Sequence, residues 1–125
     1  MSSSYLSPFQ FLTAQSMTGS FNSSSIQLNT GTCISIQAVW SGGGSPVGSL
    51  KLQVSNDRGL QGGQQVSDSQ ASWTDVTSPA AIAVSGNAGS AFFDFQKTAA
   101  FAVRLVYTVT SGTATMNAYA CVKNR

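Results

Sequence analysis

The sequence predicts an all-β protein: an antiparallel β-sandwich, jelly-roll-like, with about eight strands and an extended N-terminal arm. Three observations lead to this prediction. Apolar and polar residues alternate with a period of two along most of the chain, whereas the 3.6-residue period of a helix is absent. Turn signals rich in glycine, serine and asparagine separate the alternating runs. Hydroxyl side chains are frequent, with 21 serines and 11 threonines.

The length of 125 residues and the apolar fraction of 42% are typical of one folded domain. We expect residues 1–15 to form the arm and residues 16–125 to form a single β-sandwich domain. No apolar run approaches the ~20 residues of a membrane-spanning helix. The N-terminus also lacks the basic residues of a signal peptide. We therefore expect synthesis in the cytoplasm and no membrane partner.

The arm joins a flexible start, Ser2-Ser3-Ser4, to apolar side chains that are costly to leave in water. These side chains are Tyr5, Leu6, Phe9, Phe11 and Leu12. Two interpretations stay open. Either the arm folds back on its own domain, or it docks on a neighbouring subunit and is the partner-binding segment.

In the first half of the domain, alternation predicts short strands at 16–21, 26–28, 33–40 and 49–54. The third of these strands directs one set of apolar residues to a single face, and we expect that set in the core: Ile34, Ile36, Ala38 and Trp40. The glycine-rich stretch 42–46, which ends in proline, is expected to break the chain after this strand.

Residues 55–72 are predicted to form a long polar loop. Such a length exceeds the usual connection in a compact domain and makes the loop a candidate for function. Its possible ligand-binding residues are Asp57, Arg58, Gln64, Gln65 and Asp68. A short hairpin around Val66 is the alternative.

In the second half, short strands are predicted at 73–76, 82–84 and 91–95, and the clearest two follow at 101–110 and 113–122. Ser111-Gly112 is the expected turn between the last two strands. We expect both Trp40 and Trp73 to pack in the core. The alternation places Tyr119 on an outer face. It is therefore a better candidate than the two tryptophans for contact with a sugar at the surface.

The chain has ten charged side chains and no histidine, which argues against catalysis. Enzymes usually transfer protons with His, Glu or Asp, and the acidic residues here are scattered among turn residues: Asp57, Asp68, Asp75 and Asp94. The six basic residues form no cluster of the kind that binds nucleic acid. The sequence therefore predicts a binding or structural protein that is not an enzyme and uses no cofactor.

The two cysteines, Cys33 and Cys121, match no metal-binding spacing. The strand phase places both on outer faces, and we expect two unpaired thiols. A disulfide between them is the alternative, and it requires that their strands be neighbours.

One pattern goes beyond composition. The stretch GSLKLQVSND at 48–57 is followed, after the long loop, by Trp73-Thr74-Asp75-Val76, and FAVRLVYTVTSG comes later at 101–112. This order resembles small β-sandwich structural proteins of tailed-bacteriophage virions, of the decoration or cement kind. It resembles discoidin-like carbohydrate-binding sandwiches more faintly. The likeness spans about 16–122, and residues 58–72 are an insertion where such proteins have a short turn.

The resemblance implies a structural protein of a phage particle, most concretely a capsid decoration (cement) protein made in the host cytoplasm. Its partners would be viral capsid or other virion proteins and further copies of itself, a trimer being a guess at the symmetry. The arm would bind the neighbour. Two alternatives stay open: a receptor- or glycan-binding module of a tail fibre or cell surface, which would use the long loop, and a major shell protein made of a single jelly roll.

Overall fold

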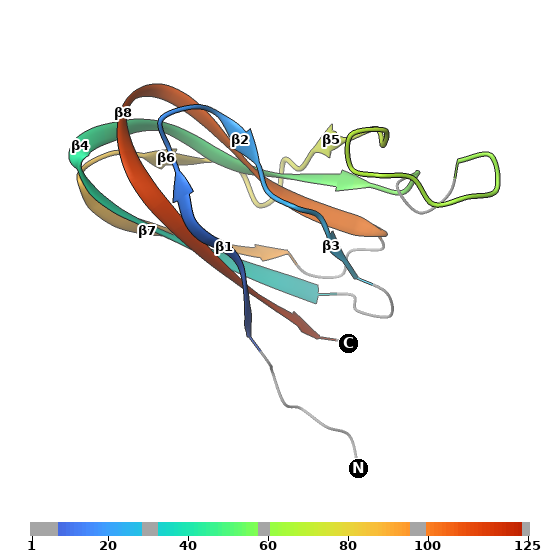
Figure 1. Ribbon diagram of the computed structural model, residues 1–125. Helices are drawn as coiled ribbons and strands as arrows, with labels where there is room; N and C mark the ends of the chain where they lie inside the picture. Colours follow the sequence, from blue (N-terminus) through green and yellow to red (C-terminus); the bar gives the residue numbers. More distant parts are fainter. Residues whose placement is uncertain (1–7, 29–32, 58–60, 96–99, 124–125) are drawn as a thin grey trace, which may run out of the picture.

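The computed structural model describes residues 8–28, 33–57, 61–95 and 100–123, which form one antiparallel sheet of eight strands (Figure 1). The strands are β1 (Phe9–Ser16), β2 (Phe21–Asn22), β3 (Ile26–Gln27), β4 (Cys33–Ser55), β5 (Thr74–Asp75), β6 (Ile82–Val84), β7 (Ala88–Phe95) and β8 (Ala102–Lys123). Within the described ranges no helix has the length and apolarity needed to cross a membrane. The prediction of an all-β, antiparallel fold is confirmed.

Two long strands form the frame of the sheet. β4 and β8 pair with each other along almost their whole length, from Cys33 opposite Lys123 to Ser55 opposite Ala102. On the other side of β4, β7 pairs with its first part, and β6 and β5 pair with its last part. On the other side of β8, β1 pairs with its last part, and β2 and β3 pair with its first part.

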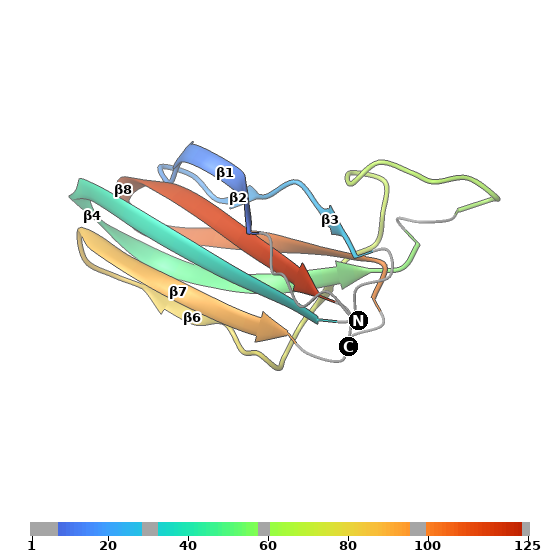
Figure 2. The same ribbon diagram turned by 90° about the horizontal axis from the view of Figure 1, so that it is seen from below.

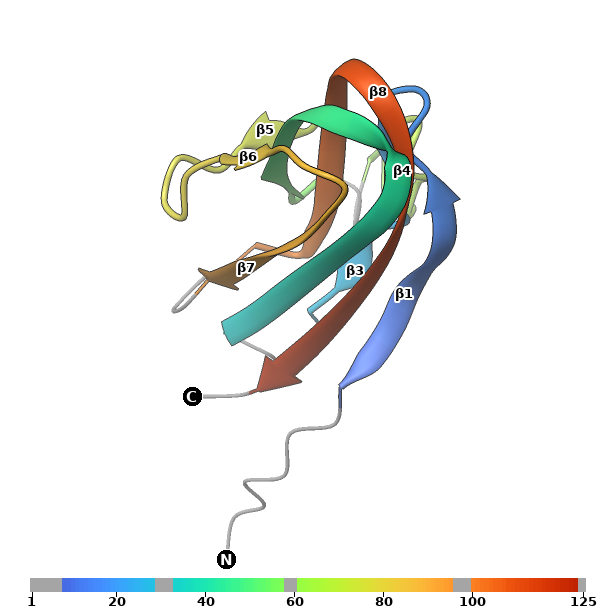
Figure 3. The ribbon, with the colours of Figure 1, turned by 90° about the vertical axis from the view of Figure 1, so that its left-hand side faces the viewer.

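Both long strands arch in the middle, so that the sheet folds over and its two halves face one another (Figure 3). We call the half that contains β1 and β7 the first half-sheet. The half that contains β2, β3, β5 and β6 is the second half-sheet. The arrangement is consistent with the predicted sandwich, but both of its layers come from one continuous sheet.

The expected chain breaks at 42–46 and at Ser111-Gly112 are wrong, because both stretches lie inside long strands as bends. Glycine is required there because the two backbones approach closely. A Cβ on Gly44 would lie 2.5 Å from the Thr113 carbonyl oxygen, and Gly112 has a φ of 80°. Register shifts in the β4–β8 ladder fall at the same bend. The glycines therefore let two neighbouring strands bend together without losing their pairing.

The core fills the space between the two half-sheets, and the alternating residues of β4 and β8 supply most of it. The predicted core set of β4 is confirmed, since its four side chains are at most 4% exposed. One cluster joins residues from both halves of the sheet: Ile34, Ile36, Ala38, Trp40, Leu50, Leu52, Phe93, Val103, Leu105, Tyr107, Met116 and Ala118. Burial of each large apolar side chain contributes about 1.5–3 kcal/mol, which makes this cluster the main stabilising element.

The N-terminal segment belongs to the sheet from residue 9 onward. β1 pairs antiparallel with β8, from Phe9 opposite Ala120 to Ser16 opposite Thr115, so the domain boundary expected between residues 15 and 16 falls inside a strand. Leu12 is buried in the chain's own core and Phe11 packs against it. For these two residues the structure supports the interpretation that the arm folds back. Tyr5 and Leu6 lie outside the described residues.

The strand expected at 16–21 is also wrong, because β1 ends at Ser16 and the short β2 begins only at Phe21. The polar stretch after β2 is held to β8 by hydrogen bonds of Ser23. Ser23 is buried, its amide donates to the Leu105 carbonyl oxygen, and its Oγ accepts from the Leu105 amide. A buried serine thus continues the ladder where regular strand pairing stops.

Neither cysteine forms a disulfide, as expected. They lie on neighbouring strands, where Cys33 is opposite Lys123 and Cys121 is opposite Ser35. Cys33 lies on the outer face of β4, as expected, because it alternates with the core residue Ile34, but it is only 7% exposed, so the expectation of a half-buried thiol is wrong for it. Its neighbour Ile34 is also buried, so both faces of β4 are covered at this end of the strand.

The close approach of β4 to Tyr107 generates a prediction about stability. A Cβ at position 48 would clash with the Thr108 carbonyl oxygen and lie 2.8 Å from both Cε1 and Oη of Tyr107, which is fully buried. Gly48→Ala is therefore expected to lower the free energy of unfolding by about 1–3 kcal/mol through overpacking. Chemical denaturation followed by tryptophan fluorescence measures this change.

The matched control is Gly43→Ala in the same strand, where a Cβ would meet no atom within 4 Å. This change should stay within about 0.5 kcal/mol of the wild-type stability. Equal stability of the two variants would contradict the close approach of Gly48 to Tyr107 and Thr108.

Candidate functional site

The long loop after β4 projects from one end of the folded sheet (Figure 1). At its tip Gln61 and Gln64 exchange both backbone hydrogen bonds, with N···O distances of 2.7 and 3.0 Å. Gly62 and Gly63 have positive φ values of 56° and 88°, as a type I′ turn requires. A turn closed by one bridge therefore lies within the loop, but it lies at these glycines, so the position expected for the alternative hairpin, around Val66, is wrong.

Asp57 joins the two ends of this loop. Its Oδ1 accepts from the Ser72 amide at 2.9 Å and from Ser55 Oγ at 2.9 Å, and its Oδ2 accepts from Gln61 Nε2 at 3.1 Å. The amide of Ser72, followed by these side-chain donors, holds the pKa of Asp57 below its ordinary value because each bond favours the charged carboxylate. Asp57 is thus the clamp that closes the loop.

Asp68 anchors the far side of the loop to the second half-sheet. Its two carboxylate oxygens accept from the backbone amide of Ser25 at 2.9 Å and from Ser25 Oγ at 2.7 Å. Its backbone carbonyl oxygen accepts from Trp73 Nε1 at 2.9 Å. Ser25 directly precedes β3, so this one aspartate ties together segments that are far apart in the sequence.

Trp73 lies outside the core, contrary to expectation. It is half-buried, and the guanidinium carbon of Arg104 lies 4.3 Å from its ring centroid. A guanidinium stacked on an indole is an attractive cation–π contact. Trp73 therefore serves as the platform that connects the loop to an outward-facing residue of β8.

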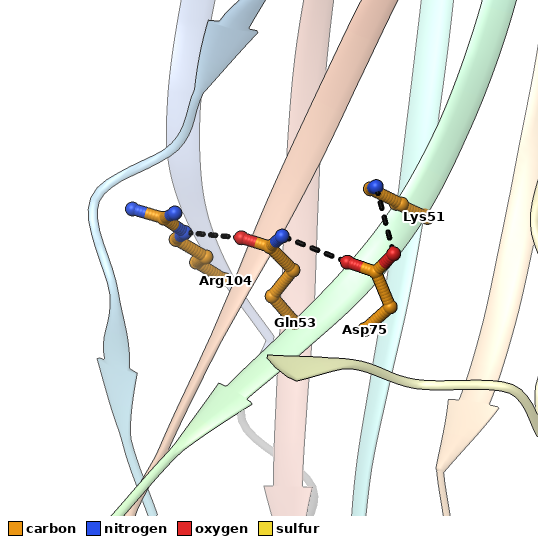
Figure 4. Close-up of polar contacts among 4 residues, drawn as sticks. All are labelled: Lys51, Gln53, Asp75 and Arg104. Atoms are coloured by element: carbon orange, nitrogen blue, oxygen red, sulfur yellow. Dashed lines mark hydrogen bonds and ion pairs between the residues drawn. The ribbon is translucent and has the colours of Figure 1, made fainter. Parts of the chain in front are cut away.

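From Arg104 a row of polar contacts continues across the second half-sheet (Figure 4). Arg104 Nε donates to Gln53 Oε1 at 2.9 Å, and Gln53 Nε2 donates to Asp75 Oδ1 at 2.8 Å. Lys51 Nζ lies 3.0 Å from Asp75 Oδ2. The Gln53 amide thus presents its oxygen to a cation and its nitrogen to an anion. The bond from Gln53, and then Lys51, lowers the pKa of Asp75.

These contacts define what the predicted ligand residues do. Asp57 and Asp68 are engaged in holding the loop, whereas Gln64 and Gln65 have exposed side chains at its tip. Arg58 lies outside the described residues. Among the described residues no group of three or more His, Cys, Asp or Glu could hold a metal ion. The described part of the loop therefore exposes mainly side-chain amides and hydroxyl groups.

An open hollow of about 600 Å³ lies at the base of the loop. Apolar atoms make up most of its lining, although several of the lining residues are polar: Val54, Ser55, Asn56, Asp57, Ser72, Thr74 and Ala100. Asn56 Oδ1 accepts from the Phe101 amide at 2.8 Å. The polar groups that edge the hollow therefore contribute to joining β4, β8 and the loop.

A second exposed surface lies on the outer face of the first half-sheet. Phe92 of β7, Gln37 of β4, Tyr119 of β8 and Gln10 of β1 stand opposite one another across four adjacent strands. Phe92 is 58% exposed and Tyr119 37%, which confirms the outward phase of Tyr119. Sequence reasoning missed this row. The signal for it is the pair Phe92-Phe93, because adjacent residues of a strand point to opposite faces.

The clamp formed by Asp57 generates a prediction about pH. Because the pKa of the folded carboxyl lies below the ordinary value of 3.8, the contribution of the clamp is fully present above pH 3.8. It is lost as the pH falls through the lower pKa of the folded state. The Ser72 amide resonance in two-dimensional NMR should therefore titrate with a midpoint below 3.8, while Asp57→Asn abolishes that titration. A Ser72 midpoint at or above 3.8 would contradict the clamp.

No family model matches the chain, and the search of curated proteins finds no match. Among solved structures the fold is similar to one described as the crystal structure of SPBc2 prophage-derived protein YomS. The match has a TM-score of 0.51 at 13% sequence identity, and it covers 95% of this chain and 94% of that chain. At this identity the likeness shows a shared fold, which extends over nearly the full length of both chains.

Proposed function

We propose that this chain is a non-enzymatic structural protein of a bacteriophage particle, most concretely a capsid decoration (cement) protein that binds the shell. The observation that carries the proposal is the fold shared with a prophage-derived protein over nearly the whole of both chains. The sequence pattern at 48–57, 73–76 and 101–112 independently resembles small β-sandwich structural proteins of tailed-bacteriophage virions.

The use of the carboxylates supports a role in adhesion. General acid–base catalysis needs a carboxylate or another titratable group free to approach a substrate. Asp57, Asp68 and Asp75 instead accept hydrogen bonds that hold the loop and the edge strand β5 in place. These three carboxylates thus stabilise the fold of the chain itself.

The proposed contact with the shell uses the apolar residues at the start of the chain. Of the five arm residues, Leu12 and Phe11 are committed to this chain's own core. Phe9 stands at the beginning of β1 and is 41% exposed. We assign shell binding to Tyr5, Leu6 and Phe9, because their burial in a partner supplies the apolar area that a specific interface needs.

Removal of residues 1–7 combined with Phe9→Ser tests this contact. Co-sedimentation with particles from cultures that make the protein should weaken about tenfold or more, because burial of one such side chain is worth about 1.5–3 kcal/mol. β1 remains from Gln10 onward, so circular dichroism and thermal unfolding should still report a folded sheet. Val47→Ser is the matched control, since Val47 is 39% exposed but lies at the bend.

Retained binding by the truncated protein would remove the arm from the mechanism. Mass spectrometry of purified particles tests the broader proposal, and absence of the protein from them would overturn it. Copy number per particle tests the alternative of a major shell protein, because the major shell protein is the most abundant protein of a capsid.

A glycan-binding module is the second candidate, favoured by the exposed ring of Tyr119 beside the exposed amide of Gln37. Gln64 and Gln65 at the loop tip offer further amides. Aromatic faces combined with a few polar groups are common in ligand sites. Saturable binding to particular sugars on a glycan array, lost in Tyr119→Ala, would favour this candidate over the decoration protein.

A further inference from the structure

The edge strand β7 is long and regular. It pairs with β4 at eight consecutive positions, from Ile34 opposite Phe95 to Ser41 opposite Ala88, with no register shift. Figure 2 shows it at the margin of the first half-sheet, next to β4. Among the described strands β4 alone pairs with it. The other edge of β7 therefore presents a row of backbone N–H and C=O groups suited to pairing with a further strand.

The remaining edges of the sheet are protected against such pairing. β1 contains two register shifts, and Ala14 within it has a positive φ of 49°. The strands β2, β3, β5 and β6 are only two or three residues long. Edge strands are commonly blunted by bulges, lysine, proline or short length. β7 has no bulge, lysine or proline, and Asp94 is its one charged residue.

The sequence of β7 is complementary to itself when read antiparallel about Phe92. In that register Phe92 meets its own counterpart, and Ala91 lies opposite Phe93. The small residue Gly89 lies opposite Phe95, and Ser90 lies opposite Asp94. The faces also agree, since Ala91 and Phe93 are both buried while Ser90 and Asp94 are both exposed. On either side of the central Phe92 pair, each large or acidic side chain thus meets a small or hydroxyl-bearing one.

We propose that two copies of this chain associate by pairing β7 with β7 of the second copy, antiparallel, about a two-fold axis at Phe92. The first half-sheets of both copies then form one continuous sheet, in the order β1-β8-β4-β7-β7-β4-β8-β1. Main-chain hydrogen bonds supply the attraction and the opposed side chains set the register. A two-fold interface is self-complementary, as this strand is. The proposal goes beyond the particle role and does not rest on it, and it replaces the trimer with a dimer.

The pairing gives Phe92 a partner. Its side chain is the most exposed large apolar group of the described residues at 58%, and in the dimer it lies against Phe92 of the second copy. Aromatic pairs directly opposite each other on an antiparallel ladder are among the favourable cross-strand contacts. The dimer therefore covers the apolar side chain that the single chain exposes most.

A charge test at position 90 is specific for this register. Ser90→Asp places a carboxylate opposite Asp94 of the second copy at two symmetric positions, so the dimer Kd should rise about tenfold or more. Ser90→Lys places an ammonium group there, so the Kd should stay equal or fall. Sedimentation velocity of the full chain over a dilution series measures both values. Thr77→Asp and Thr77→Lys, at an exposed position away from β7, carry the same charges and should leave the Kd unchanged.

Cross-linking tests the position of the axis. Phe92→Cys in a Cys121→Ser background should form a disulfide-linked dimer under mild oxidation, because the two residues lie directly opposite. Val39→Cys in the same background is the control, since Val39 is 37% exposed but lies on the interior strand β4. It should cross-link about tenfold more slowly or not at all.

Three results would overturn the proposal. The first is a monomer at chain concentrations up to about 1 mM, where even weak specific association is populated. The second is a dimer that responds equally to Ser90→Asp and Ser90→Lys, which would place the interface elsewhere. The third is a monomer that takes up an extended segment of another protein along β7, which would make the edge a site for a different partner.

Discussion

Continuous pairing of β4 with β8, from Cys33 opposite Lys123 to Ser55 opposite Ala102, is the interaction on which the other elements depend. Every other strand pairs with one of these two. The ladder survives its own bend because glycines at 44 and 112 allow backbone contacts that a Cβ would prevent. Once the two strands arch together, their alternating side chains face each other and close the core without a second, separate sheet.

The loop is placed by the same frame. It leaves β4 at its C-terminal end and returns through Trp73 to β5, which pairs with β4. Asp57 closes its base, and Asp68 ties it to Ser25 before β3. Three of the four carboxylates of this chain, those of Asp57, Asp68 and Asp75, therefore have a structural role. The free surface is left to amides, hydroxyl groups and a small number of apolar side chains, which suits binding between proteins.

The two proposed contacts occupy different edges of the first half-sheet. Phe9 lies at the start of β1, whose register shifts discourage pairing with a further strand, so an apolar side chain is the proposed means of contact there. β7 lies at the opposite margin, where the backbone N–H and C=O groups of a regular strand make the proposed contact. The proposed shell contact and the proposed dimer contact are compatible, because β8 and β4 separate the two edges.

Local alternation in the sequence determined the all-β class, the core set of β4, the strong final strands and the outward phase of Tyr119. These properties depend on neighbours along the chain, which the sequence displays directly. Only the tertiary structure decided that Gly42–Pro46 and Ser111-Gly112 are bends and not breaks, since a glycine run permits both and the partner strand selects one. The same holds for Trp73 and Asp68. Their roles rest on Arg104 and Ser25, which the folded sheet brings to them from distant parts of the chain.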